Sequence, residues 1–282
     1  MNEGKGSRTA ERVAERRAAH QLLDRPPVFD DPLALRIIGA EAEARIRENP
    51  QAYNRLPVSG YLRAFLAVRS RFAEDELRAA VARGIRQYVV LGAGYDTFAY
   101  RNPFSDLRVF EVDHPATQAA KRQRLADAAI EVPPAMTFVP VDFARASLAE
   151  ELAASGFDAG APAFFSWLGV VPYLELEAIQ ATLRFIGSLP AGTTLVFDYG
   201  SQPSALSWAG RFVFNQMAKR VASVGEPWKT FFAPDELLAL LRASGFSVAE
   251  DSGPAGLNAR YLSGRADGLR VGEMAHIAKG VV

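Results

Sequence analysis

The order of hydrophobic and polar positions divides the chain near residue 84. Before that point apolar residues recur at helical spacing, and after Thr9 one face of the expected helix carries Ala10, Val13, Ala14, Ala18 and Leu22. Beyond it, short runs of β-branched and aromatic residues alternate with amphipathic stretches. The pattern predicts an N-terminal helical cap over residues 1–84 and an α/β core over residues 85–282.

Capping residues and prolines set the expected limits of the cap helices. Thr9 suits the start of the first helix, and Arg25-Pro26-Pro27 ends it. Asp31-Pro32 is expected to open a second helix, because Asp suits the cap and Pro the first helical position. A third helical stretch covers residues 61–83. These helices are too few and too amphipathic to form an enzyme alone, so we expect them to pack against the core.

The core pattern predicts a Rossmann-like sheet of seven strands. The strand-like runs are 87–91, 107–112, 137–141, 163–167, 193–198, 246–250 and 273–279. Helical stretches at 115–129, 147–154, 174–188 and 234–244 alternate with them, which is typical of a mostly parallel sheet with helices on both faces. Residues 251–272 read as a polar loop without a helical pattern, which predicts an antiparallel last strand. Class I methyltransferases have this layout.

One long segment, residues 201–232, interrupts the step from the fifth strand to the next helix. It contains the large apolar residues Trp208, Phe212, Phe214, Met217 and Trp228. Because long insertions after the carboxyl end of a strand often cover the ligand crevice, we interpret this segment as a cap insertion. The same aromatic residues are also compatible with ordinary core packing.

The most informative local motif joins the first two strands. The run 88–91 leads into Gly92-Ala-Gly94, and the next strand ends at Asp113. In an α/β protein this arrangement binds a nucleoside, because the glycines let the backbone approach the ligand and the acid accepts both ribose hydroxyls. A dinucleotide fingerprint requires Gly or Ala where this chain has Thr97. The motif therefore favours S-adenosylmethionine (SAM), with its aminopropionyl group over Gly92 and Gly94, rather than NAD.

Composition excludes several other classes of function. The chain has 32 basic and 32 acidic residues among 282, and zero net charge leaves no electrostatic footprint for nucleic acid or an anionic membrane. There is no cysteine, and His20, His114 and His276 lie far apart, so we expect neither a disulfide nor a metal site. Residues 1–17 lack the apolar core of a signal peptide, and no long apolar run occurs. We therefore expect a cytoplasmic monomer or homodimer that acts on a small-molecule acceptor.

An ordered set of motifs resembles one particular family. The longest are Leu91-Gly-Ala-Gly-Tyr-Asp-Thr-Phe-Ala-Tyr-Arg101 and Phe110-Glu-Val-Asp-His-Pro115. Shorter motifs accompany them along the chain: Thr9-Ala10, Phe29-Asp-Asp-Pro-Leu-Ala34, Arg69-Ser-Arg-Phe72, Asp75-Glu-Leu77, Lys121-Arg122, Val141-Asp-Phe143, Tyr173-Leu174 and Phe197-Asp-Tyr199. Together they resemble the leucine carboxyl methyltransferase-like family, in its branch of bacterial O-methyltransferases.

The resemblance implies which residues contact the amino acid part of SAM. Arg69 pairs with the SAM carboxylate, a task that suits the parallel N–H donors of a guanidinium. Arg71 is the nearby competitor for this role. Asp96 holds the SAM ammonium or stabilises the loop itself.

The resemblance also implies which residues contact the nucleoside. Asp113 accepts the ribose hydroxyls, and Glu111, two residues earlier on the same side of the strand, is the alternative. Asp142 accepts the adenine amino group, or else serves only as a helix cap. Phe143 lies against the adenine ring or donates its backbone N–H.

Around the acceptor the chain departs from the family pattern. Where many relatives have Glu-Gly/Cys-x-x-x-Tyr after the fourth strand, this chain has Leu168-Gly-Val-Val-Pro-Tyr173, so the role of that glutamate does not transfer. We expect the acceptor pocket beyond the fourth and fifth strands, with Tyr173, Asp198 and Tyr199 as candidate catalytic residues. Arg260 is a further candidate that would hold an anionic acceptor, unless it forms a surface salt bridge.

These residues predict O-methylation of a carboxylate or an acidic hydroxyl on a small metabolite, such as an acid of secondary metabolism. A carboxylate is ionised at neutral pH, whereas a phenol or alcohol usually needs a base. The three histidines are poorly placed for that task, although Tyr173, Asp198 or Tyr199 would also serve. The alternatives are an N- or hydroxyl-directed small-molecule methyltransferase, an NAD-dependent oxidoreductase and a SAM-binding protein without turnover.

Overall fold

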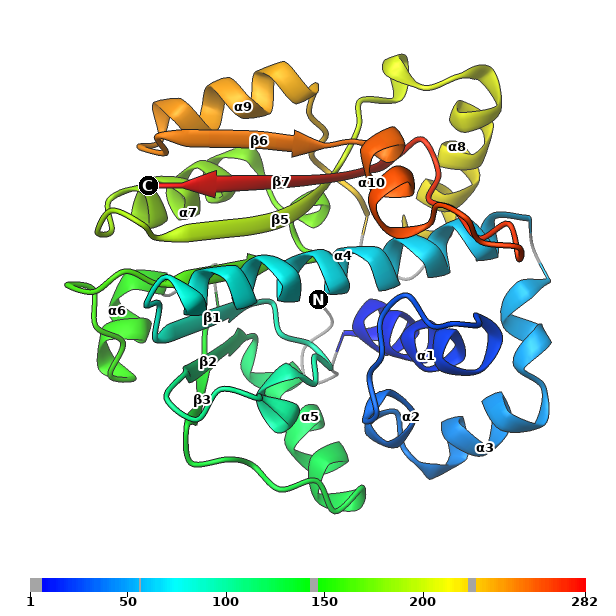
Figure 1. The fold of residues 1–282 in the computed structure, drawn as a ribbon, viewed down its shortest axis with the longest axis horizontal. Helices are drawn as coiled ribbons and strands as arrows, with labels where there is room; N and C mark the ends of the chain where they lie inside the picture. The colour runs from blue at the N-terminus through cyan, green and yellow to red at the C-terminus, as the bar shows by residue number, and fades with distance from the viewer. Residues whose placement is uncertain (1–6, 56, 143–146, 223–226) are drawn as a thin grey trace.

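A seven-stranded sheet runs through the centre of the computed structural model, which describes residues 7–55, 57–142, 147–222 and 227–282 (Figure 1). Its strands are β1 Gln87–Leu91, β2 Arg108–Asp113, β3 Met136–Pro140, β4 Phe164–Trp167, β5 Thr194–Gly200, β6 Val248–Ser252 and β7 Ala275–Val281. They lie in the order β3-β2-β1-β4-β5-β7-β6. All pairings are parallel except those of β7, which runs antiparallel to β5 and β6. The expected Rossmann-like sheet with a reversed last strand is confirmed.

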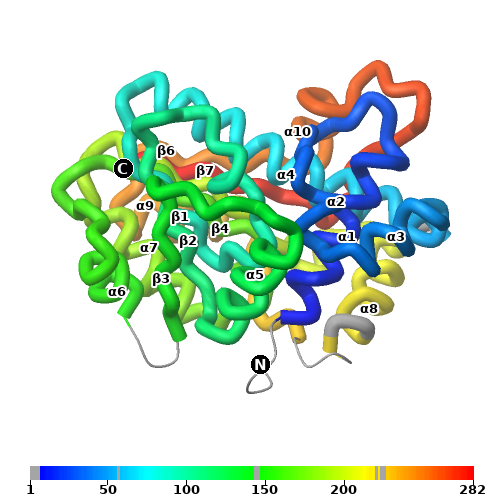
Figure 2. The backbone as a smooth tube through the Cα atoms, turned by 90° about the horizontal axis from the view of Figure 1, so that it is seen from below, coloured from blue at the N-terminus to red at the C-terminus, as the bar shows by residue number. Residues whose placement is uncertain are grey.

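Helices cover both faces of the sheet and the carboxyl ends of its parallel strands. They are α1 Arg8–Leu23, α2 Ala34–Ile37, α3 Ala40–Glu48, α4 Pro57–Ala82, α5 Pro115–Asp127, α6 Leu148–Ala154, α7 Leu176–Gly187, α8 Trp208–Ala222, α9 Pro234–Ala243 and α10 Pro254–Tyr261. Short 3-10 turns are η1 Pro50–Asn54, η2 Phe98–Arg101, η3 Val171–Tyr173 and η4 Pro203–Ala205. In Figures 1 and 2, α1, α2, α3 and α8 lie at the same end of the molecule, which in Figure 1 is the end where the parallel strands finish.

The connection between β6 and β7 differs from the sequence expectation. Residues 251–272 contain the end of β6 and the helix α10, so the prediction of an uninterrupted polar loop is wrong. Pro254 stands in the first turn of α10, where its missing N–H has no helical partner to lose. Leu257 is the buried residue of this eight-residue helix. A short helix with so little buried surface leaves no apolar periodicity to detect.

The cap helices begin at slightly different residues from those expected. Ser7 rather than Thr9 caps α1, since its hydroxyl accepts the N–H of Ala10 at 3.1 Å. Asp31 accepts the N–H of Leu33 at 3.1 Å, and the short α2 follows instead of one long helix. Among the described residues, no helix has the length and apolar character needed to cross a bilayer.

Alternate residues of the central strands contribute to two hydrophobic clusters. Tyr88 and Val90 of β1 belong to the cluster on the α4 face, whereas Val89 and Leu91 belong to the opposite one. All residues of β1 are buried, as expected for a parallel strand covered on both sides. On the opposite face, α6, α7 and α9 contribute Leu152, Leu183 and Leu241.

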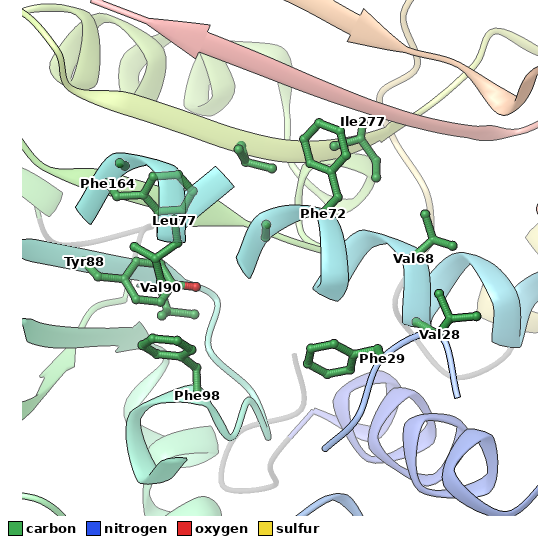
Figure 3. Close-up of a cluster of buried hydrophobic side chains, with 14 of the residues drawn as sticks. Val28, Phe29, Val68, Phe72, Leu77, Tyr88, Val90, Phe98, Phe164 and Ile277 are labelled. Carbon is green, nitrogen blue, oxygen red and sulfur yellow. The ribbon is translucent and has the colours of Figure 1, made fainter. Parts of the chain in front are cut away.

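Helix α4 belongs to the hydrophobic core even though it precedes residue 84. Figure 3 shows the cluster that it forms with the sheet and the cap: Val28, Phe29, Val68, Phe72, Leu77, Tyr88, Val90, Phe98, Phe164 and Ile277. The other cap helices form a smaller cluster, in which Ala14 and Ala18 of α1 lie with Ile37, Ile46 and Leu125. The cap and the sheet therefore share buried surface.

A buried polar network joins the cap to the glycine segment at Asp31. Its carboxylate accepts from Thr97 Oγ1 at 2.8 Å and from Arg17 Nη2 at 2.7 Å. Arg101 Nε lies 3.4 Å from the same carboxylate, and Arg101 also pairs with Glu74 of α4. The residue that breaks the dinucleotide fingerprint, Thr97, thus connects the segment after α1 to the turn after β1.

The charges around Asp31 set its ionisation. Burial by itself would raise the pKa of Asp31, but the guanidinium groups of Arg17 and Arg101 outweigh burial and lower it below 3.8. Because the folded-state pKa is depressed, this group stabilises the fold fully above about pH 4, and its contribution is lost as the pH falls through the folded-state pKa.

We expect Asp31→Asn to lower the free energy of unfolding at pH 7 by about 3 kcal/mol, because it leaves buried guanidinium groups without their carboxylate. The difference from wild type should shrink as the pH falls below about 4, where the unfolded-state carboxyl becomes protonated, and it should be lost below the lowered pKa of the native carboxylate. Urea denaturation at pH 7 and at the lowest pH that preserves the fold measures both effects. Asp30→Asn, at the exposed neighbouring position, is the matched control. Equal stability of the two variants at pH 7 would contradict this role of Asp31.

Candidate functional site

Two adjoining cavities lie at the carboxyl ends of the parallel strands. The smaller, here called the glycine-loop cavity, has a volume of about 400 Å³ and is lined by residues 90–96 together with Asp113 and Asp142. The larger, here called the aromatic cavity, has about 650 Å³ and is lined by parts of α4, α8 and the segment before β7. Five residues line both cavities: Thr9, Val13, Arg69, Gly169 and Tyr173. The two spaces therefore meet, and α1 contributes to the shared wall.

The glycine loop approaches neighbouring segments too closely for a side chain. Gly92 has φ 68°, and a Cβ there would lie 2.3 Å from Val170 Cγ2. Gly94 has φ 48°, and its Cβ would lie 3.2 Å from the Cβ of Ala10 in α1. Both positions need the left-handed backbone that glycine adopts without strain. The sequence identified these two glycines, and the structure places both in the lining of the glycine-loop cavity.

The structure separates the two acids at the end of β2. Asp113 lines the glycine-loop cavity and accepts the N–H of Gly94 at 2.6 Å. Burial raises the pKa of Asp113, and the backbone N–H donors of Gly94 and His114 oppose that rise. Glu111 instead forms a buried ion pair with Lys121 at 2.6 Å and accepts from the hydroxyl of Tyr100. The alternative candidate Glu111 is therefore engaged away from the cavity.

Two further cofactor candidates, Asp96 and Asp142, lie along the same cavity. Asp96 lines it and accepts the N–H of Phe98 at 2.8 Å, which stabilises the turn. Arg17 Nη1 is 4.0 Å from the Asp96 carboxylate. Asp142 also lines the cavity, one residue after the buried Val141. The prediction for Phe143 lies outside the described residues.

Arg69 lies where the cavities meet, and its partner is Asp198 of β5. Nη1 of Arg69 is 2.9 Å from Oδ2 of Asp198, and both side chains are buried. The other oxygen of Asp198 accepts the backbone N–H of Gly169 at 2.5 Å. Gly169 has φ 74°, and a Cβ there would lie 2.8 Å from Nη2 of Arg69. Arg71, the competitor, pairs with Asp75 at the helix surface.

The two predicted tyrosines reach different surroundings. Tyr173 of η3 lines both cavities. Tyr199 also lines the aromatic cavity, but it follows Asp198 on β5, so its side chain points to the opposite face of the sheet, where its hydroxyl donates to Asp251 at 2.8 Å. Burial raises the pKa of Tyr199, and the bond to Asp251 raises it further, so the hydroxyl stays protonated at neutral pH.

The structure does not bring Arg260 to the cavities. Its guanidinium lies over the rings of Phe72 and Tyr261 and 3.4 Å from Glu76. In the described chain Arg260 is absent from the lining of either cavity. The expectation that it holds the acceptor is corrected, because α10 was not foreseen and turns this residue away.

Each histidine has a structural contact. His20 Nε2 accepts two backbone N–H groups, so Nδ1 carries the proton that it donates to Asp24 at 2.7 Å. His114 caps α5 through Nδ1, although it also lines the glycine-loop cavity. His276 Nδ1 lies 3.1 Å from Asp251. Among the described residues, no group of three or more metal-ligating side chains is placed to hold an ion.

The wall of the aromatic cavity contains residues that the sequence did not single out. Tyr61 and Phe65 precede Arg69 on α4 at intervals of four residues, and this spacing is the signal that would have found them. Arg270 lines the same cavity from a segment whose place depends on α10. Of the aromatic insertion, Met217 and Trp228 line the cavity, whereas Trp208 and Phe212 are exposed.

Comparison with known proteins finds relatives whose names describe methyltransferases. Residues 10–187 match the family model described as leucine carboxyl methyltransferase. A Bacillus subtilis (strain 168) protein named "Putative S-adenosyl-L-methionine-dependent methyltransferase YktD" is 32% identical over 298 residues, which cover 98% of each chain. A Mycolicibacterium gilvum (strain PYR-GCK) protein named "Putative S-adenosyl-L-methionine-dependent methyltransferase" is 35% identical over 68% of this chain and 65% of its own length.

Solved structures share the fold. The crystal structure of a DUF574 family protein from Streptomyces avermitilis MA-4680 has a TM-score of 0.57 and 19% identity, over 95% of this chain and 96% of that chain. The crystal structure titled "putative methyltransferase" from Thermobifida fusca YX has a TM-score of 0.59 and 18% identity, over 99% of this chain and 96% of that chain. At such identities these similarities show the architecture alone.

Two substitutions should separate the roles of the acids at the end of β2. We expect Asp113→Asn to weaken SAM binding by about 2 kcal/mol, since one acceptor oxygen becomes a donor, with little change in the melting temperature of the free protein. Glu111→Gln should instead destabilise the fold by about 3 kcal/mol, because it leaves Lys121 buried and unpaired.

Calorimetric titration with SAM and thermal denaturation of both variants give the two readouts. The opposite pattern, in which Glu111→Gln weakens binding and Asp113→Asn does not, would exchange the two assignments.

Proposed function

The chain belongs to the leucine carboxyl methyltransferase family and is a SAM-dependent methyltransferase, and from this premise we propose that it methylates a carboxylate or an acidic hydroxyl of a small metabolite. Of the alternatives, the NAD-dependent oxidoreductase and the SAM-binding protein without turnover do not agree with the family. When bound, SAM supplies a methyl group on a sulfonium, which an acceptor oxygen takes as the carbon–sulfur bond breaks and S-adenosylhomocysteine leaves.

We propose that the glycine-loop cavity holds SAM. The backbone of Gly92 and Gly94 would lie beside the aminopropionyl group, Asp113 would accept the ribose hydroxyls and Asp142 would accept the adenine amino group. Asp96 stabilises the turn beside the ammonium group. Support for this set comes from one cavity, which is lined by all five residues: Gly92, Gly94, Asp96, Asp113 and Asp142.

Arg69 would bind the SAM carboxylate while it remains paired with Asp198. A guanidinium has five N–H donors, and the ion pair with Asp198 uses Nη1, so other donors are left for a second carboxylate. Its position in the shared lining supports this role. Tyr173 shares that lining and would help to orient the acceptor.

The ion pair of Arg69 with Asp198 is the observation that favours an acceptor already ionised. In the described lining of the aromatic cavity the carboxylates are Asp198 and Glu273. Asp198 is held by Arg69 and by the Gly169 N–H, and Glu273 accepts from the N–H and hydroxyl of Ser207. A carboxylate acceptor needs no proton removed, so the chain has only to align its oxygen with the methyl group.

The cap and the core would have different roles in binding and methyl transfer. We propose that residues 1–84 cover the site, with Thr9 and Val13 of α1 in the shared wall, and that residues 85–282 form the catalytic core. The insertion at 201–232 adds Met217 and Trp228 to the acceptor side. A largely apolar wall binds few water molecules, which strengthens the electrostatic interactions of the reacting groups beside it.

The acceptor class is tested by the stability of the product. With SAM carrying a labelled methyl group and a panel of carboxylic acids, phenols and amines, we expect a labelled product that releases methanol in mild base. Methyl esters hydrolyse under these conditions, whereas ethers and N-methyl products do not. A base-stable labelled product would assign the chain to hydroxyl or nitrogen acceptors instead.

The role of Asp198 is tested by its isosteric amide. We expect Asp198→Asn to raise the KM for SAM about tenfold, because Arg69 loses its anchor, and to leave the shape of the pH–rate profile unchanged. Loss of a general base would instead lower kcat by a factor of about 100 or more and remove the acidic limb of the profile. Asp235→Asn, at an exposed position of α9, is the control. The second outcome would make Asp198 the base and favour a hydroxyl acceptor.

A further inference from the structure

One face of α4 forms a continuous wall from the meeting point of the two cavities to the far side of the aromatic cavity. Tyr61, Phe65 and Arg69 all line this cavity at intervals of four residues. Arg69 also lines the glycine-loop cavity, whereas Tyr61 lines only the aromatic one. At 1.5 Å per residue, the helix rises about 12 Å between Tyr61 and Arg69. The cavity therefore has a transfer end at Arg69 and a distal end at Tyr61.

The distal end carries a cation with one neutral partner. Arg270 lines the aromatic cavity at the exposed surface of the protein, and its Nη2 donates to the hydroxyl of Tyr61 at 3.0 Å. Its guanidinium carbon lies 5.5 Å from the centre of the Tyr61 ring. Within the described chain, no carboxylate lies within salt-bridge distance of Arg270. The guanidinium thus keeps donors for another group.

The nearest acid of the same segment does not neutralise this cation. Glu273 lines the cavity too, but its two oxygens accept from the N–H and hydroxyl of Ser207 at 3.0 and 2.8 Å. At the transfer end, by contrast, the charge of Arg69 is matched by Asp198. Glu273 keeps its own charge, so what distinguishes the distal end is a guanidinium without a salt-bridge partner in the described chain.

Between its two ends the cavity is largely apolar. Leu62, Phe65 and Leu66 of α4 face Met217 and Trp228 of the insertion across this space, since all five line it. Such a wall favours a hydrocarbon or aromatic body and offers it few hydrogen bonds. A ligand that fills the cavity would meet a guanidinium at each end, Arg69 at one and Arg270 at the other.

We propose that the acceptor is a two-ended molecule: a methylatable acid at the Arg69 end, an apolar body along α4, and a second anionic group bound by Arg270 at the Tyr61 end. This inference rests on the proposed function, because the transfer end is identified by the proposed SAM site. Arg270 is a specificity-determining residue in this scheme, and Tyr61 positions its guanidinium. Acids that lack the second anion would leave Arg270 without an ionic partner and would bind less tightly.

The test compares matched ligands by calorimetry on the protein loaded with S-adenosylhomocysteine, so that it does not depend on turnover. The probes are α,ω-dicarboxylic acids and the monocarboxylic acids of equal chain length, over a series of lengths. We expect the wild type to bind the diacid about tenfold more tightly at an optimal length, because a charge-assisted pair forms at the distal end. Arg270→Gln should abolish that preference and leave the affinity for monoacids within about twofold.

Control variants distinguish a specific contact from a general effect. Arg78→Gln removes an exposed arginine of α4 that lines neither cavity in the described structure, and it should keep the preference for diacids. Tyr61→Phe should reduce the preference without changing the affinity for monoacids. Three results would each overturn the proposal: the wild type binds diacids and monoacids equally at every length, it binds neither, or Arg270→Gln loses affinity for both by the same factor.

Methyl transfer to the same acids is measured in parallel. If diacids bind through Arg270 but no methyl ester forms from any acid, the proposed carboxylate methylation fails while the distal contact stands. If esters form from both kinds of acid with equal kcat/KM, the proposed function stands and the distal contact fails.

Discussion

The ion pair between Arg69 of α4 and Asp198 of β5 is the contact on which the arrangement of both cavities depends. Removing two charges from water is expensive, and the attraction between them offsets that cost only when the geometry is good and further hydrogen bonds satisfy the remaining atoms. Here Asp198 receives the Gly169 N–H as well, and Gly169 adopts a left-handed conformation that leaves space for the guanidinium. The pair thereby fixes the height and rotation of α4 over the sheet. The line of residues from Tyr61 to Arg69 acquires its direction from this anchor.

A second anchor holds the cap on the opposite side of the glycine loop. Asp31 binds both Thr97 of the loop and Arg17 of α1, and Arg101 extends the network to Glu74 of α4. The cap helices bury mostly small side chains, such as Ala14 and Ala18, which contribute little apolar area each. Directional polar contacts therefore decide where α1 sits. Its residues Thr9 and Val13 reach the shared wall of the cavities as a result.

The two arginines of the aromatic cavity differ in their partners, and this difference would let the protein bind the two acidic groups of the proposed acceptor in different ways. At the proposed SAM site, Arg69 is paired with Asp198 and would also bind the SAM carboxylate, so a reacting oxygen would meet little net positive charge there. At the far side of the aromatic cavity, Arg270 has only the Tyr61 hydroxyl as a described partner. A guanidinium that held the reacting carboxylate tightly would lower its nucleophilicity. Binding at the distal group avoids this conflict, because it uses a part of the acceptor that does not react.

Much of this molecule follows from local patterns along the chain. The strand runs, the turn Gly92-Ala-Gly94 and the acid Asp113 at the end of β2 depend on short-range periodicity and on backbone conformations that only glycine adopts readily, so they were predictable. Arg69, Tyr173 and Asp142 came from resemblance, and the structure places all three in the cavity linings. Helix α10 was missed because a short helix with so little buried surface has no periodic pattern.

Such local patterns did not predict which charged side chains pair with one another. Nothing in the sequence indicated that Asp198 pairs with Arg69, 129 positions away. The hydroxyl of Tyr199 is engaged by Asp251, and Arg260 is held by Glu76. Arg270 lines the cavity from a segment that is hydrogen-bonded to α10 through Asn258 and Val271. Local sequence specifies which elements form, because backbone preference and amphipathic spacing act over a few residues. Which charges meet is a property of the packed fold, because an ion pair depends on distances that the chain sets only when distant segments come together.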